Sequence, residues 1–194
     1  MSRRGYHHGD LRAALIATSF EELAEQGLPR FSVAAVARRL GVSTAAPYRH
    51  FPDRDRLLAA VSSVAAHDLR AEIATAAAAA GHDPRHRFAA AAATYVRFVA
   101  RTGAGFDVIF AAELYAVTDP ERTERTRALM TDLLTVTAEA CAGPPEETVR
   151  LVEAMIATAH GYTTLFTTGF WRRAGTPLDE IADRAAAAAR SLLA

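Results

Sequence analysis

Residues 32–51, with the sequence SVAAVARRLGVSTAAPYRHF, predict two short helices joined by a tight turn. Ser32 can start the first helix, because its hydroxyl can accept a hydrogen bond from a free backbone N–H of the first turn. Gly41 ends that helix, since glycine adopts the left-handed C-terminal conformation at little cost. Ser43 caps a second helix over 44–50. The segment therefore predicts a helix-turn-helix.

The distribution of charge favours a nucleic-acid partner for this segment. Residues 1–56 hold nine arginines and six acidic residues, whereas the rest of the chain holds 13 arginines and 16 acidic residues. The net charge of the whole chain is +0 and hides this asymmetry. A basic end suits docking on phosphates, and an acidic body does not. The alternative is an ordinary surface hairpin of two helices.

Features of the N-terminal part resemble one protein family. They are a long first helix ending at Gly27, the segment VAAVARRLGVS, and the segment PYRHFPDRDRLL leading directly into a long helix. From about Asp10 to Val64 the chain resembles the DNA-binding domain of the tetracycline-repressor-like (TetR) family of bacterial transcription regulators. The segments YHHGDLR and AHGYTTLFTTG resemble one subgroup, which has a His-Gly pair in its eighth helix. Pro47 departs from the family pattern, in which a larger aliphatic residue is common.

The resemblance implies that the second helix of the pair reads duplex DNA. Hydroxyl groups and small apolar side chains at its start would face base edges and thymine methyl groups. This base-reading set is Ser43, Thr44, Ala45 and Pro47. Contacts to phosphates or to the groove wall would come from Ser32, Val33, Tyr48, His50 and Arg54, and from an N-terminal arm with Tyr6, His7 and His8. The alternatives are that Tyr48 packs against the next helix, that His50 caps its own helix, and that Arg39 is solvated.

The remaining chain predicts helices and no strand. Three later helices begin with a capping residue followed by proline, which suits the first helical turn: Asp83-Pro84, Asp119-Pro120 and Thr176-Pro177. Glycines within 103–105 and 143–145 separate helices from one another.

We therefore expect an all-α fold with about nine helices and two domains. An N-terminal helix-turn-helix domain of three helices would span 9–69. A helical domain for effector binding and dimerisation would span 70–194. A long helix over 53–79 would join them and would be the lever between effector and DNA.

The segment 146–169 is too apolar for a helix on the surface of a monomer, because its two apolar stripes cover more than half of its circumference. The helix after Pro177 also has one apolar side. We expect both helices to pair with their copies across a two-fold axis. The expected interface residues are Val152, Met155, Ile156, Ala159, Thr163, Phe166, Phe170, Leu178 and Ile181. The alternative is that both stripes are internal core of a monomer.

A homodimer would place two recognition helices in successive major grooves, about 34 Å apart, on a near-palindromic operator. The helical body would bind a small apolar or amphipathic effector in an apolar cavity that has a few polar groups. The candidate ligand-binding residues are Tyr95, Phe98, Phe106, Phe110, Tyr115, Met130, His160 and Thr164. The alternative is that these aromatic residues, and His160 with them, are ordinary core.

The sequence favours no enzyme. It contains no glycine-rich phosphate loop, no nucleophile elbow and no Cys/His set with metal-ligand spacing. We therefore predict no catalytic residue, no cofactor and no metal site. His82, Asp83 and His86 fit the start of a helix, and Glu21, Glu22 and Glu25 fit a solvated helix face. The alternative of a different class is a helical ligand-binding or scaffold protein without specific DNA binding.

The sequence also predicts a cytoplasmic protein without a membrane partner. No run is apolar for long enough to span a bilayer, and no secretory signal is present. The single cysteine, Cys141, fits a reducing compartment and a role as a small apolar filler.

Overall fold

The computed structural model describes residues 11–171 and 174–193, which form eight α-helices, short 3-10 helices and no strand. The α-helices are α1 (Leu11–Gln26), α2 (Val33–Arg39), α3 (Arg54–Ala79), α4 (Pro84–Thr102), α5 (Phe106–Ile109), α6 (Pro120–Ala140), α7 (Pro145–Thr167) and α8 (Leu178–Ser191). The 3-10 helices η1 (Leu28–Arg30), η2 (Pro47–Arg49) and η3 (Ala112–Ala116) connect them. The all-α prediction is confirmed.

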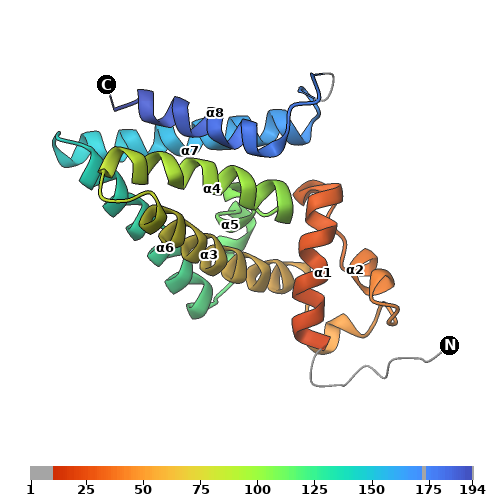
Figure 1. Cartoon of the computed structure of the whole chain (residues 1–194). Helices are drawn as coiled ribbons and strands as arrows, with labels where there is room; N and C mark the ends of the chain where they lie inside the picture. The colour runs from red at the N-terminus through yellow and green to blue at the C-terminus, as the bar shows by residue number, and fades with distance from the viewer. Residues whose placement is uncertain (1–10, 172–173, 194) are drawn as a thin grey trace.

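The helices form a small head at one end of a larger helical body (Figure 1). α1 and α2 make the head, and α3 runs from the head into the body. Within the body, α4 packs against α3, α7 and α8, while α6 packs against α3. α3 crosses the expected domain boundary at residues 69 and 70 without a break, so it can transmit a displacement between the two parts.

One continuous hydrophobic core fills both parts. Leu15, Val36 and Leu57 are fully buried in the head. In the body, Phe88 and Phe98 of α4 are the largest fully buried side chains. Each fully buried side chain of this kind stabilises the fold by about 1.5–3 kcal/mol.

Aspartate caps start three of the long helices. The Asp53 side chain accepts the N–H of Arg56 at 2.7 Å and starts α3. Asp83 and Asp119 cap α4 and α6 in the same way, each before the proline that the sequence predicts at the first turn. Thr176 was expected to cap the last helix, and this is wrong. α8 starts after Pro177 without a side-chain cap.

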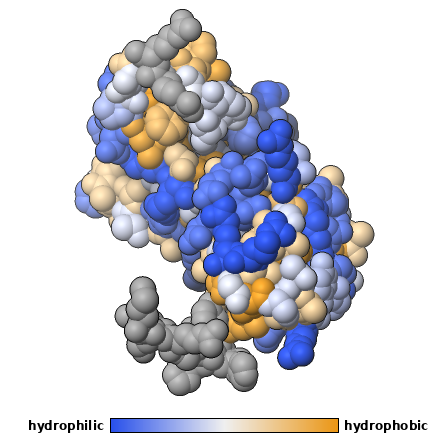
Figure 2. All heavy atoms as spheres, turned by 90° about the vertical axis from the view of Figure 1, so that its right-hand side faces the viewer, coloured by the Kyte–Doolittle hydropathy of each residue, from blue (hydrophilic) through white to orange (hydrophobic). Residues whose placement is uncertain are grey.

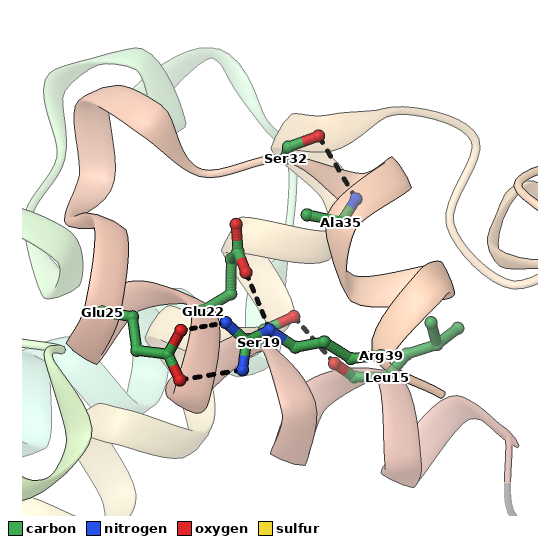
Figure 3. A network of polar contacts seen from close by, with 7 residues as sticks. All are labelled: Leu15, Ser19, Glu22, Glu25, Ser32, Ala35 and Arg39. Carbon is green, nitrogen blue, oxygen red and sulfur yellow. Dashed lines mark hydrogen bonds and ion pairs between the residues drawn. The ribbon is translucent and has the colours of Figure 1, made fainter. Parts of the chain in front are cut away.

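An arginine between two glutamates holds α2 against α1 (Figure 3). Arg39 Nε donates to the Glu22 carboxylate at 3.0 Å, and the terminal nitrogens of Arg39 donate to the Glu25 carboxylate. Glu22 is only 4% exposed. The expectation that Glu22 lies on a solvated face is therefore wrong. Arg39 is exposed, as its alternative role predicts, but it is also paired with both carboxylates.

The strength of the ion pair between Arg39 and Glu25 depends on pH. Hydrogen bonding to Arg39 lowers the pKa of Glu25 below its ordinary value. A carboxylate whose pKa is lowered by folding stabilises the fold above its unfolded pKa, and this contribution is lost as the pH falls through the folded pKa. The attachment of α2 to α1 is therefore present at neutral pH and weakens in acid.

A glycine permits close approach of the body to the head. Gly103 ends α4 with φ +66°, and a Cβ atom there would overlap the backbone of Leu23 and Ala24 in α1. Only glycine combines the left-handed conformation with the small volume that this contact requires. α1 and α4 can therefore pack directly against each other.

Replacing Arg39 by alanine should destabilise the protein. The buried Glu22 carboxylate would lose its cation, so we expect the free energy of unfolding to fall by about 1–3 kcal/mol. Arg38→Ala is the matched control, because Arg38 is the exposed neighbour and its loss should cost less than about 0.5 kcal/mol. Urea denaturation at neutral pH measures both. Equal losses would show that the glutamate pairs do not hold α2.

Replacing Gly103 by alanine should cost more than replacing Gly81. Both glycines have positive φ, but a Cβ at Gly81 would meet nothing within 4 Å. We expect Gly81→Ala to cost about 1–2 kcal/mol, and Gly103→Ala to cost a further 1–3 kcal/mol or so because of the overlap with α1. Thermal unfolding of both variants compares them. Similar losses would mean that α1 and α4 are not in tight contact.

Candidate DNA interface and effector site

The helix-turn-helix begins as the sequence predicts. Ser32 Oγ accepts the backbone N–H of Ala35 at 3.4 Å and starts α2. Gly41 follows the helix with φ +68°, and the N–H of Val42 donates to the carbonyl of Ala37 at 3.1 Å. This left-handed end reverses the chain directly after α2.

The recognition segment, residues 43–50, is a series of tight turns instead of an α-helix. Within it only Pro47–Arg49 is helical, as η2, and no side-chain cap starts η2. The carbonyl of Ser43 accepts the N–H of Ala46 at 3.0 Å. Pro47 has no N–H to donate, so an α-helix cannot form its regular bond at this position. The expected α-helix over 44–50 and the capping role of Ser43 are wrong for this reason.

The recognition segment nevertheless presents most of the expected side chains to solvent. Those exposed are Ser43, Thr44, Ala45, Tyr48 and His50. The Tyr48 side chain is 51% exposed, so packing against the next helix does not bury it. Pro47 was expected to face base edges, and this is wrong. Its ring is buried, because the tight turn directs it inward.

Two residues expected at phosphates have side chains that are engaged within the protein. The Val33 side chain is buried, so only its backbone at the start of α2 could face a phosphate. The Arg54 guanidinium donates to the carbonyl of Leu28 at 3.1 Å and lies 5.8 Å from the centre of the Phe31 ring. It also pairs with Glu113 of η3 at 3.5 Å, which ties the start of α3 to the body. These contacts compete with the phosphate contact expected of Arg54.

Three arginines outside the predicted set are better placed for phosphates. Arg30, Arg38 and Arg49 are exposed, and within the described residues none of them forms an ion pair. Hydrophilic atoms cover much of this end of the molecule (Figure 2). Sequence position could have suggested Arg49, which lies inside the recognition segment. The arm residues Tyr6, His7 and His8 lie outside the described residues.

The body contains a connected aromatic cluster. The Tyr95 hydroxyl is 2.8 Å from His160 Nδ1 and accepts the N–H of Phe106 at 3.0 Å. Phe106 stacks on Phe110, with ring centres 5.2 Å apart. Burial raises the pKa of Tyr95 above its ordinary value, so the hydroxyl is neutral and available for hydrogen bonding. The structure thus brings four of the expected ligand-binding residues together.

The other four expected ligand-binding residues lie apart from the cluster or at its edge. Phe98 is 1% exposed and is core. Thr164 lies on the exposed face of α7. Tyr115 and Met130 line an open groove between η3 and α6.

This groove, called the η3–α6 groove below, has a volume of about 400 Å³. Phe110 links it to the aromatic cluster, and Leu134 extends its apolar wall along α6. Its volume lies within the range of small-molecule sites. Phe110, Tyr115 and Met130 were predicted from the sequence, because aromatic and methionine side chains gather there near interrupted helices.

The most unusual residue of the groove was not predicted from the sequence. Arg122 of α6 is 5% exposed, and its guanidinium donates to Ser62 Oγ of α3 at 3.0 Å and to the carbonyls of Ile109 and Leu114 at 3.1 and 3.3 Å. Ser62 also donates to the carbonyl of Ile109 at 2.8 Å. Burial lowers the pKa of Arg122 from its ordinary value, although arginine stays protonated in proteins.

The expected dimer residues divide into two groups. Five lie inside the protomer, so their assignment to an interface is wrong: Val152, Met155, Ala159, Thr163 and Ile181. α4 and α8 pack against this side of α7 and cover it. Ile156, Phe166 and Leu178 are half-buried, and Phe170 is 68% exposed. α7 also exposes Val149 and Leu165.

Solved structures with the same fold include regulators. A protein of unknown function from Rhodococcus sp. RHA1 is 30% identical, with a TM-score of 0.71, and the match covers 97% of this chain and 98% of that one. A transcriptional regulator from the same organism is 24% identical, with a TM-score of 0.65 and coverage of 94% and 95%. A substituted TetR from Acinetobacter baumannii AYE, solved with minocycline, is 20% identical, with a TM-score of 0.57 and coverage of 97% and 95%.

No curated protein sequence matches the chain. Two family models do match it. Residues 15–61 match the family described as bacterial regulatory proteins of the tetR family. Residues 88–189, more than half of the chain, match the tetracyclin repressor-like C-terminal domain. The helix-turn-helix head and the helical body agree with both matches, and this chain belongs to the TetR family of bacterial transcription regulators.

Proposed function

We propose that this DNA-binding regulator is a repressor that binds a near-palindromic operator as a homodimer and is released by a small organic effector. The exposed residues Ser43, Thr44 and Ala45 carry this proposal, because they are solvent-accessible within the recognition segment, which also exposes Arg49, while α2 exposes Arg38. Hydroxyls and a methyl group can read base edges, while the arginines hold phosphates. Such a regulator acts in the cytoplasm, where its DNA lies.

The homodimer would form on the outer face of α7. Val149 and Leu165 are 46% and 41% exposed at its two edges, near opposite ends of the helix, and large apolar side chains of this kind favour association. The half-buried Ile156 lies on the same edge as Val149. Two copies would set the spacing of the two recognition segments, which must match successive major grooves.

Effector release would act through the segment between α5 and α6. Arg56 donates to the carbonyl of Thr118 at 2.7 Å, and Arg54 pairs with Glu113. The start of α3, directly after the recognition segment, is therefore attached to this segment. An effector that moves it would change the position of the head. A coupling free energy of about 1–3 kcal/mol would lower operator affinity roughly 5- to 150-fold.

The η3–α6 groove is the effector site that this coupling favours. A larger cavity of about 680 Å³ lies at the opposite end of the body, where Asp83 and Glu147 are among its lining residues. Its residues come from helix ends that lie away from the head, such as the start of α4 and the end of α6. The η3–α6 groove, in contrast, is lined by Arg122, which donates a hydrogen bond to Ser62 of α3. A ligand in this groove can therefore act on α3.

The arginines that we assign to phosphates can be tested by replacement. Arg49→Ala should lower affinity for all DNA sequences and reduce the slope of log affinity against log salt by about one unit for each phosphate that the variant no longer neutralises. Thr44→Val should instead change the preferred sequence, at a cost of about 1–3 kcal/mol on the wild-type site. Duplexes selected from a random library, titrated by fluorescence anisotropy at several salt concentrations, measure both. If the wild type selects no sequence, the scaffold or ligand-binding alternative holds.

The proposed dimer face can be tested by placing a charge on it. Leu165→Arg should shift the protein to a monomer and abolish cooperative binding to the selected duplex, because two cations would oppose each other at the interface. Thr75→Arg is the control, since Thr75 is exposed on α3. Sedimentation velocity at micromolar concentration measures the assembly of both. A wild-type monomer, or an unchanged Leu165→Arg dimer, would contradict this assignment.

A further inference from the structure

Arg122 is a buried cation without a carboxylate partner among the described residues. Its guanidinium hydrogen bonds go to one hydroxyl and two backbone carbonyls, all of them neutral. Arginine is almost never fully buried unless it is paired, because removing its charge from water is costly. The carbonyls at the end of α5 and in η3 offset part of this cost through their dipoles. Asp119, which caps α6, acts on this charge through space, but it accepts the backbone N–H of Arg122 and forms no direct pair with the guanidinium.

Other arginines of the body differ from Arg122 in this respect. Arg70 pairs with Asp132 at 2.6 Å, Arg87 with Glu139 at 2.5 Å, and Arg97 with Asp179 at 2.8 Å. All three are more exposed than Arg122, so they need a partner less. Arg122, which of these arginines most needs an anion, lines the η3–α6 groove.

The groove beside Arg122 is amphipathic, because apolar and polar side chains both line it. Phe110, Tyr115, Met130 and Leu134 supply apolar surface, and three threonines with Arg127 supply the rest of the polar lining. Among the described residues, no acidic side chain lines the groove. The Tyr115 ring is 71% exposed, and its centre lies 5.9 Å from the guanidinium of Arg122. An apolar molecule with one anionic end matches this arrangement of charge and surface.

We propose that the η3–α6 groove binds an organic carboxylic acid with an apolar body, whose carboxylate pairs with Arg122. Arginine has five N–H donors, and three are used by Ser62, Ile109 and Leu114, so two are left for a carboxylate. The apolar body lies along Phe110, Tyr115 and Met130. The ligand carboxylate thereby provides the direct anionic partner that the Arg122 guanidinium lacks within the described residues.

Binding at this position would act on the proposed effector mechanism, on which this consequence rests. Arg122 contacts Ser62 of α3 as well as the carbonyls at the end of α5 and in η3. A carboxylate that draws the guanidinium toward the groove weakens these bonds. α3 and η3 would then be free to shift relative to each other.

Calorimetric titration of the full chain with three matched probes tests the site. They are 4-phenylbutyrate, the neutral 4-phenylbutan-1-ol and the cationic 4-phenylbutylamine, each up to millimolar concentration. We expect the acid to bind roughly 10- to 100-fold more tightly than the alcohol, because the alcohol cannot form a charge-assisted pair. The amine should not bind. Equal affinity of acid and alcohol, or no binding of the acid, would overturn the proposal.

Two kinds of variant show where the acid binds, and the second kind separates a loss of binding from a loss of folding. Arg122→Gln should remove the preference for the acid over the alcohol. Because this change can also destabilise the fold, Thr131→Trp provides a second test. Thr131 is exposed in the groove, so tryptophan should fill the groove and abolish acid binding without lowering the melting temperature. Thr135→Trp, one turn further along α6 and outside the groove, should bind the acid normally. Acid binding that survives Thr131→Trp would place the site elsewhere and overturn the proposal.

A separate measurement distinguishes this site from the proposed function. The selected DNA duplex is titrated with and without 4-phenylbutyrate. If the acid binds through Arg122 but the affinity for DNA does not change, the carboxylate site stands and its role in release fails. If the acid lowers the DNA affinity of the wild type but not that of Thr131→Trp, the carboxylate site and its role in release are both supported.

Discussion

The attachment of the first turns of α3 to the segment between α5 and α6 is the constraint on which the rest of this structure depends. Arg54 and Arg56 bind that segment from the head side, and Ser62 binds the carbonyl of Ile109 one to two turns later. Arg122 joins the same group from α6. Because α3 begins directly after the recognition segment, the orientation of that segment is fixed by contacts made in the body.

A second contact between head and body limits how the head can move. Gly103 allows the end of α4 to touch the backbone of α1. Within the head, Arg39 holds α2 against α1 through Glu22 and Glu25. The head is thus held together by its own contacts and is attached to the body at two places, at α3 and at α1. A change in the body would therefore rotate the whole head more readily than it would deform it, since packed units have discrete arrangements.

Local signals in the sequence predicted most of the elements, and long-range packing explains the errors. The caps at Ser32, Asp83 and Asp119 depend on residues three or fewer positions away, so the sequence alone reveals them. The sequence also predicted that α7 has an apolar face, but it did not predict which helices cover that face. Val152 and Met155 pack inside the protomer because α4 and α8 return to that face, which periodicity cannot show. Arg122 was missed because its partners lie 8 to 60 positions away.

We propose that the exposed residues of the recognition segment enter the major groove and that a two-fold assembly sets the spacing of the two copies. Hydroxyl-radical and methylation footprinting of a duplex selected from a random library tests it most directly. We predict major-groove protection of guanines in two tracts related by a dyad, with centres one helical turn or a small multiple of it apart. A footprint confined to the minor groove, or a single tract without symmetry, would contradict the account.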